Sequence, residues 1–253
     1  MTGFSVEPIH GIGLVEPGDD LPRILLDAIT GCGFALEDGD VVAVAQKIVS
    51  KAEGRQVDLA SVSASAQAVA LAADTEKEPR LVQLILDEST AVMRKKPGVL
   101  IVRHRLGLVG AHAGVDQSNI DHGDGNAALL LPKAPDASAQ TIRKGLCEAT
   151  GRNVGVLITD SANRPWRLGT VGIAIGAAGF CVLDDRRGGR DLYGRELKVT
   201  LVNRADSIAA AATLAMGETT ERTPAALVRG LPASDSDDTA GMIVRPLEDD
   251  LFR

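Results

Sequence analysis

Aromatic residues are scarce in this chain, which contains one Trp, one Tyr and four Phe among 253 residues. Proteins that bind single-stranded nucleic acid need several aromatic side chains on which bases can stack. A basic surface is also not indicated, because the formal net charge is −7 and nonspecific binding requires a face that neutralises phosphates. The composition therefore argues against a nucleic-acid partner.

Cysteine is equally sparse, and Cys32, Cys147 and Cys181 stand far apart without a CxxC pair. This spacing disfavours a structural zinc site and a disulfide framework, and it suits the reducing cytoplasm. No stretch reaches the ~20 apolar residues that a membrane span requires. No basic segment at the start precedes an apolar one, so no signal peptide is expected. We expect a soluble cytoplasmic protein without a membrane partner.

Four familiar catalytic motifs are missing from the sequence. They are the GxxxxGK[ST] phosphate loop, the GxGxxG dinucleotide fingerprint, the GxSxG nucleophile elbow and the HExxH metalloprotease motif. The chemistry therefore has to come from polar residues near the ends of apolar strands.

Apolar strand-like stretches interspersed with helix-forming ones predict an α+β fold with mixed, largely antiparallel sheets. Two strands over 98–105 and 106–114, joined by a tight connection, favour antiparallel pairing over a pure βαβ series. The glycine-rich stretch 170–180 predicts a strand that other backbone approaches closely. The other expected elements are helices over 18–33, 59–95 (in two pieces broken near Pro79), 136–151 and 206–217, and strands over 40–51, 153–160, 196–206 and 225–230.

The composition changes after Leu231. The stretch PASDSDDTAG is polar and acidic, and MIVRPLEDDLFR then turns apolar again. We expect one domain over residues 1–231, followed by an acidic linker and C-terminal tail over 232–253. The apolar end indicates either docking onto the body or a junction with a further domain.

Acidic and polar side chains follow two of the expected strands. Asp116 and Asn119 come after 106–114, and Asp160 and Ser161 stand at the end of 153–160. Carboxylates from two strand ends can converge on a hard cation such as Mg²⁺ or Mn²⁺, which prefers oxygen ligands. The alternative is local, with Asp116 in an Asx-turn and Asp160 capping the next segment. Residue type alone leaves both open.

Two basic groups suit anionic ligands. Lys47 and Lys51, four apart on an expected strand, face the same side and either hold phosphates or line a solvated edge. Arg164 and Arg167 flank the only tryptophan, Trp166. They either clamp carboxylates or phosphates beside the indole, or belong to a surface loop pinned by a buried indole.

Eight blocks of the sequence occur together in one order: GDDL, GDVVAVAQKIVSKAEGR, RLGLVGAHAGVDQSN, LLPKAPDASA, ITDSANRPWRLG, AIGAAG, RDLYGREL and VRGL. In this order they resemble the coenzyme F420-0:L-glutamate ligase family, the gamma-glutamyl ligases of deazaflavin biosynthesis. The resemblance covers about residues 7–231, and its specificity lies in the number of blocks in register.

The resemblance implies a GTP-dependent amide ligase that joins L-glutamate to coenzyme F420-0, and further gamma-glutamyl units in some members, through an acyl phosphate. It implies a pair of Mg²⁺ or Mn²⁺ ions, K⁺ as a helper, and a two-part subunit in an intertwined V-shaped homodimer. A flavin reductase domain follows a segment like RPLEDDLFR in some relatives, so a fused or separate reductase is a further expected partner. The rival hypotheses are a nucleotide-dependent ligase for another acid and a metal-dependent nucleotide-binding protein without turnover.

Carried over by motif, the resemblance implies that Asp116 and Asp160 are catalytic metal ligands, joined by Ser161 and Glu218. The arginines and tryptophan of the ITDSANRPWRLG block, Arg164, Trp166 and Arg167, are expected at the substrate. Two departures are Ser161, which keeps the hydroxyl of the usual Thr, and Gln46, where Ser is usual. Nucleotide contacts are expected from Gly11, Ile12, Gly13, Leu14, Gln46, Lys51, Asn119, Met216, Gly217 and Glu218.

Overall fold

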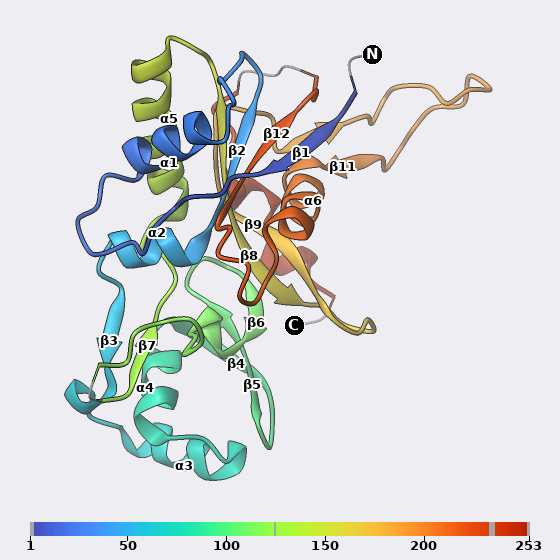
Figure 1. Ribbon diagram of the computed structural model, residues 1–253. Coiled ribbons are helices and arrows are strands. Elements are labelled where there is room, and N and C mark those ends of the chain that lie inside the picture. Colours follow the sequence, from blue (N-terminus) through green and yellow to red (C-terminus); the bar gives the residue numbers. More distant parts are fainter. Residues whose placement is uncertain (1–2, 124, 233–235, 252–253) are drawn as a thin grey trace.

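The computed structural model describes residues 3–123, 125–232 and 236–251, which form a larger and a smaller part (Figure 1). The larger part is built on a five-stranded sheet. Its neighbouring strands are antiparallel except for one parallel pair, β2 with β8. The mixed α+β class with mostly antiparallel sheets is therefore confirmed. In spatial order the strands are β1 (Ser5–Pro8), β12 (Ala225–Arg229), β2 (Val41–Ala45), β8 (Gly155–Asn163) and β9 (Thr170–Ala178).

This sheet is covered on both faces. Helices α1 (Leu21–Gly31) and α5 (Pro135–Thr150) lie on one face, and α6 (Arg204–Met216) lies on the other (Figure 1). Alternate residues of β2 serve the two cores: Val42 and Val44 pack with α1 and α5, while Val41 and Ala43 pack with α6. A strand buried on both faces reads as an unbroken apolar run, which explains the sequence VVAVA.

The smaller part is inserted between β2 and β8, after helix α2 (Gln46–Ala52). Its own core gathers residues such as Leu59, Ile85 and Leu100, separate from the two cores of the large sheet. β3 pairs with β7, and β4, β5 and β6 form an antiparallel sheet. The elements are β3 (Gln56–Asp58), η1 (Leu59–Ser61), α3 (Ala66–Thr75), α4 (Pro79–Asp87), β4 (Ser89–Lys96), β5 (Val99–His104), β6 (Val109–Ala111), η2 (His112–Gly114) and β7 (Ala127–Leu129).

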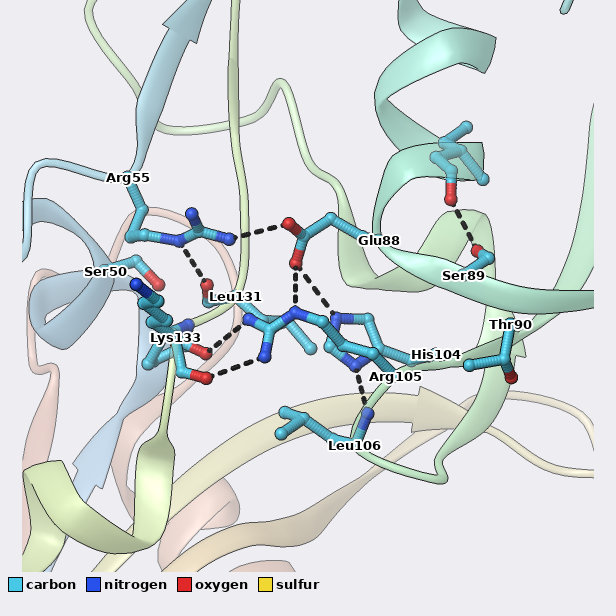
Figure 2. Close-up of polar contacts among 12 residues, drawn as sticks. Ser50, Arg55, Glu88, Ser89, Thr90, His104, Arg105, Leu106, Leu131 and Lys133 are labelled. Atoms are coloured by element: carbon cyan, nitrogen blue, oxygen red, sulfur yellow. Dashed lines mark hydrogen bonds and ion pairs between the residues drawn. The ribbon is translucent and has the colours of Figure 1, made fainter.

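The half-buried carboxylate of Glu88 links the two segments that connect the parts (Figure 2). Glu88 accepts a 2.9 Å hydrogen bond from Arg55 and a 3.1 Å hydrogen bond from Arg105, and His104 Nε2 lies 3.3 Å from the same carboxylate. Arg55 and Arg105 also donate to the carbonyl oxygens of Leu131 and Lys133, respectively, in the segment between β7 and α5. Together these contacts hold the pKa of Glu88 at about 2, although burial opposes the shift.

Two segments differ from the expected elements. The expected strand 40–51 ends at Ala45, and Gln46–Ala52 forms α2. The expected second helical piece ends at Asp87, and Ser89–Lys96 forms β4. The β4 side chains alternate between half-buried and exposed as far as Met93, which is the two-residue period of a half-buried strand. Pro79 breaks the helices as predicted, because it stands at the first turn of α4.

The glycines of β9 admit close approach, as predicted. A Cβ built on Gly172 would lie 2.1 Å from Thr213 Oγ1 and 2.5 Å from the Ala209 carbonyl oxygen, both on α6. On the opposite face, a Cβ on Gly176 would lie 2.5 Å from the carbonyl oxygen of Pro135 at the start of α5. Both helices therefore rest directly on this strand.

Helix α5 starts without a side-chain cap, because Ala134 precedes it. Asp136 in the first turn instead accepts hydrogen bonds from the backbone of Ala177 and Ala240, at 2.9 and 2.8 Å. The C-terminal segment, with η3 (Ala240–Ile243) and η4 (Leu247–Asp249), thereby contacts the larger part. An ion pair between Arg103 and Asp250 (3.3 Å) joins it to the smaller part.

A long arm projects from the larger part between β10 (Leu183–Asp185) and β11 (Leu201–Asn203) (Figure 1). It is a hairpin with Tyr193 and Gly194 at its turn, where the Gly194 N–H donates to the carbonyl oxygen of Asp191. Only Leu201–Asn203 of the expected strand 196–206 is a strand, because Asn203 caps α6 by accepting from the Asp206 N–H. Among the described residues, no helix combines the length and apolar character needed to cross a membrane.

Candidate active site

Asp160 lies at the point where the large sheet loses its parallel strand. The last pair between β2 and β8 joins Ala45 to Thr159, and Asp160 is the next residue. Contrary to expectation β8 does not end there, because it continues to Asn163 as a ribbon with β9. Burial, together with the charge of Asp116, raises the pKa of the Asp160 carboxyl to about 6. Hydrogen bonds from the Ser161 backbone and the Gln46 side chain act in the opposite direction.

Asp116 comes from the smaller part. Its N–H and C=O form a two-bond bridge with Leu129, which fixes the backbone. Its carboxylate accepts from the Ser118 N–H and hydroxyl, both at 2.8 Å, and forms a 2.6 Å ion pair with Lys47. Burial opposes ionisation, but these donors hold the pKa of Asp116 below its usual value. The Asx-turn and the approach to Asp160 therefore occur together, so the two hypotheses for this residue are compatible.

Lys47 and Lys51 lie on the same side of the chain, as expected. The element that carries them is helix α2 and not the expected strand. Residues four apart lie one above the other on α2, which directs both ammonium groups to the loop after Asp116. Lys51 Nζ donates a 3.0 Å hydrogen bond to the carbonyl of Asn119. Burial, together with the charge of Lys47, lowers the pKa of Lys51. Neither lysine lies on a solvated strand edge.

Gln46, at the start of α2, is 4% exposed. Its side-chain oxygen accepts a 2.9 Å hydrogen bond from the Ser50 hydroxyl. The Gln46 side chain also forms a hydrogen bond with the Asp160 carboxylate, which favours the charged form of that group.

Glu218, just after α6, approaches the ribbon of β8 and β9. Its carboxylate accepts from the Ser161 hydroxyl at 3.0 Å and from the Thr170 hydroxyl at 2.6 Å. Thr170 was not expected at the site. The antiparallel register of β8 and β9 pairs Thr170 with Asn163 and so brings Thr170 to the site. A prediction that β8 continues past Asp160 and pairs with β9 could have indicated this residue.

The segment after α6 also joins the loop after Asp116. The Asn119 side chain donates a 3.1 Å hydrogen bond to the carbonyl oxygen of Thr219. Gly217 has a φ of 73°, and a Cβ there would lie 2.4 Å from the Glu221 side chain, so the tight turn requires glycine. Met216, the last residue of α6, is 4% exposed and packs in the core between this helix and the large sheet.

The stretch Gly11–Leu14 follows β1 beside this turn. His10 and Thr223 are in contact at 3.3 Å, which places the loop next to the segment 217–223. Ile12 is buried in the core, while Leu14 is 86% exposed. The two glycines of the stretch have open space where a Cβ would stand.

Arg164, Trp166 and Arg167 lie in the turn that joins β8 to β9. All three are exposed, and Trp166 is 83% exposed with a left-handed φ of 60°. The alternative of a loop pinned by a buried indole is therefore wrong. The turn lies at the far end of the ribbon that carries Ser161 and Thr170.

The donor set fits a hard cation. Two carboxylates, Asp116 and Asp160, interact through their charges beside the hydroxyl of Ser161, and Glu218 bonds to that hydroxyl. Within the described residues no three His, Cys, Asp or Glu side chains are already grouped as a metal site. A cation bound to Asp116 would meet the ammonium of Lys47, which lies 2.6 Å from the same carboxylate. Asp116, Asp160 and the nearby hydroxyl are oxygen ligands of the kind that Mg²⁺ and Mn²⁺ prefer.

Comparison with known proteins identifies the family. The family described as F420-0:Gamma-glutamyl ligase matches residues 11–230, which include every site residue named above. The chain belongs to this family. A protein of Methanothermobacter thermautotrophicus named coenzyme F420:L-glutamate ligase is 43% identical over 253 residues, covering 99% of both chains.

Two further relatives carry the same name. The protein of Methanopyrus kandleri is 44% identical over 254 residues, covering 99% of this chain and 98% of the relative. That of Archaeoglobus fulgidus is 41% identical over 249 residues, covering 98% and 96%. Membership of the F420-0:gamma-glutamyl ligase family thus extends over nearly the whole chain, in agreement with the resemblance seen in the sequence.

Proposed function

We propose that this protein ligates L-glutamate to coenzyme F420-0 through an amide bond, with GTP as co-substrate, in the cytoplasmic biosynthesis of coenzyme F420. Family membership and the names of the relatives support the glutamate ligase activity. The observation that carries the nucleotide-dependent chemistry is the group formed by Asp116, Asp160 and Lys47, where two carboxylates and an ammonium converge from three elements. Such a group can hold the phosphates of a nucleotide together with a cation.

The proposed reaction has two transfers. A carboxylate oxygen of coenzyme F420-0 attacks the γ-phosphorus of GTP, the bond to the β-phosphate oxygen breaks, and GDP leaves. The amine of glutamate then attacks the acyl carbon, inorganic phosphate leaves with its bonding electrons, and the nitrogen loses a proton. The substrate supplies the nucleophile in the first transfer, so no protein Ser, Cys or His is needed in that role.

The residues of the chain bind and orient the phosphates. Lys47 and Lys51 present two ammonium groups from one face of α2, and Asn119 and the turn 217–219 border the same loop. Asp116, Asp160 and Ser161, with Glu218, would hold the pair of Mg²⁺ or Mn²⁺ ions, assisted by K⁺. The divalent ions would neutralise phosphate charge, which is the main need of phosphoryl transfer.

The exposed turn with Arg164, Trp166 and Arg167 is assigned to the anionic substrate. Guanidinium groups bind carboxylates and phosphodiesters through paired hydrogen bonds, and the indole offers a face for a flat ring. Its place on the ribbon beyond Asp160 and Ser161 supports this assignment.

We also propose a homodimer. The arm between β10 and β11 exposes Leu192 (98%), Tyr193 (95%) and Val199 (87%), although aromatic and large apolar side chains are scarce in the whole chain. Exposed apolar side chains on a projecting hairpin are typical of a surface that a partner covers. A second copy is the partner that the family resemblance implies.

The test is incubation with coenzyme F420-0, L-glutamate, GTP and Mn²⁺, followed by mass spectrometry of the product and measurement of phosphate. We expect the mass of coenzyme F420-0 to rise by one or more glutamyl residues, with one phosphate released for each amide bond. Omission of glutamate is the control, and it should suppress product. Product formation with ATP but not GTP would contradict the nucleotide assignment, and phosphate release without any gain in mass would contradict the ligase assignment.

A further inference from the structure

Lys47 is bound like a small cation. Its Nζ lies 2.6 Å from a carboxylate oxygen of Asp116, 2.8 Å from the hydroxyl of Ser118 and 3.1 Å from the carbonyl oxygen of the same serine. A carboxylate, a hydroxyl and a carbonyl are the ligands that hard cations take in proteins. The Lys47 ammonium is therefore surrounded by oxygen atoms and contacts Asp116, the carboxylate that we assign to the divalent cation.

Lys51 offers a comparison on the same helix. One turn after Lys47, it donates to a single neutral group, the carbonyl oxygen of Asn119 at 3.0 Å. The two ammonium groups are close enough to influence one another. Both lysines carry a positive charge near the site, but among the described residues only Lys47 forms an ion pair with Asp116.

We infer that Lys47 is a tethered counter-cation, which a divalent cation must displace from Asp116, and whose release couples cation binding to nucleotide binding. This inference rests on the proposed function and states how the binding of the cation and the binding of the nucleotide depend on each other. It concerns how the cation and the nucleotide bind to the site, and not which residues take part in the two transfers.

The coupling follows from charge. Asp116 and Asp160 repel each other, and the Lys47 ammonium offsets that repulsion while it remains on Asp116. A divalent ion that takes its place on Asp116 would stand beside the displaced ammonium, and the two positive charges would repel each other. An anionic phosphate offsets this repulsion, because its oxygen atoms can accept hydrogen bonds from the Lys47 ammonium and ligate the divalent ion at the same time.

Two consequences follow for the free energies of binding. A divalent cation alone binds weakly, because it competes with Lys47 for Asp116. Nucleotide strengthens cation binding, and by reciprocity the cation strengthens nucleotide binding by the same factor. Without the ammonium of Lys47, both the competition and this part of the coupling disappear.

The test is titration with Mn²⁺, followed by the electron paramagnetic resonance signal of the free ion, with and without GDP. We expect Lys47→Met to bind Mn²⁺ about tenfold more tightly than wild type without GDP, since one charged hydrogen-bonded contact no longer competes. GDP should tighten Mn²⁺ binding by wild type and have a much smaller effect on this variant. Lys51→Met is the matched control: it removes the same charge one turn away and is expected to weaken GDP binding, but at saturating GDP it should retain most of the enhancement of Mn²⁺ binding.

Lys47→Arg serves as a second variant, because it keeps the charge and should bind Mn²⁺ alone as weakly as wild type. Equal Mn²⁺ dissociation constants for wild type, Lys47→Met and Lys51→Met would overturn the inference, as would an equal effect of GDP on all three. That result would leave the proposed function intact if the wild type still formed product. Absence of Mn²⁺ binding by every protein, together with absence of product, would instead reject the proposed function.

Discussion

The hydroxyl of Thr170 donates a 2.6 Å hydrogen bond to the carboxylate of Glu218, across 48 positions of the chain. This contact holds the residue that follows α6 against the ribbon of β8 and β9. We predict that Thr170→Val lowers kcat/KM about tenfold, because Glu218 loses one of its two hydroxyl donors and with it a defined position at the proposed cation site.

The effect of Thr170→Val should appear as weaker Mn²⁺ binding as well as slower ligation. Thr170→Ser keeps the donor and should retain near wild-type values. A Val variant with normal Mn²⁺ affinity and normal kcat/KM would show that this contact has no role in positioning.

Asp160→Asn should abolish ligation without unfolding the protein. We expect at least a 100-fold loss of kcat, because a neutral amide is a poor substitute for a carboxylate at a divalent cation. The amide has the same shape and removes a buried charge that faces Asp116, so the melting temperature in EDTA should equal or exceed that of wild type. A variant that melts earlier by several degrees would assign Asp160 a structural role.

Glu88 should make stability depend on acid pH. Its pKa falls from 4.5 to about 2 in the folded protein, so the folded state binds fewer protons than the unfolded chain between these values. The contribution of Glu88 is therefore complete above pH 4.5 and is lost as pH falls toward 2. Because the side chain is 12% exposed, we expect about 2–3 kcal/mol of stability from this group.

Urea denaturation between pH 2 and 7 measures this contribution. Glu88→Gln should be less stable at pH 7 and should show a flatter dependence of unfolding free energy on pH. Glu148→Gln is the control, since Glu148 pairs with Lys144 on an exposed face of α5 at 3.8 Å. Parallel curves for Glu88→Gln and wild type would contradict the prediction.

Gly172 should tolerate no side chain. Gly172→Ala places a Cβ 2.1 Å from Thr213 Oγ1 and 2.5 Å from backbone of α6, so the helix must move away from β9. We predict a loss of about 2–4 kcal/mol in the free energy of unfolding. The matched control is Gly110→Ala, another strand glycine whose Cβ would meet no atom within 4 Å and whose φ is not left-handed. Equal stability of the two variants would contradict this packing.

The arm should control the oligomeric state. Replacing Leu192 and Tyr193 with Ser removes two of its most exposed apolar side chains. If a second copy covers them, sedimentation should shift from dimer toward monomer at micromolar concentration. Leu214→Ser, on the exposed side of α6 at 90% exposure, is the control and should leave the wild-type state unchanged. A double variant that sediments like wild type would remove the arm from the interface.

Much of the larger part could be predicted from local patterns. Residues close together in the sequence are sufficient to indicate three of its features. These are the buried apolar run of β2, the glycines of β9 and the capped start of α1. The helix at Gln46 was missed because β2 and α2 read as one apolar stretch, and the change of period at Ala45 occurs within a few residues. β4 was missed because its alternation is weak and follows directly on α4.

The site was predicted unevenly for the same physical reason. Asp116 and Asp160 stand beside apolar strands, so their proximity could be anticipated from the strands themselves. The contacts of Thr170 and Gln46 depend on register and on a buried helix start, which no short pattern displays. The exposure of Trp166 was also not decided by sequence, since a lone indole suits both a core and a ligand surface.

The insertion of the smaller part between two adjacent parallel strands determines when the site can form. Asp160 is supplied by the large sheet and Asp116 by the separate core of the insertion, while α2 crosses between them. A chain in which each core has condensed but the two have not yet docked would show full secondary structure and carry only half of the carboxylate pair. Catalytic competence would then depend on the docking of the two cores, and their separation would abolish it while every helix stayed intact.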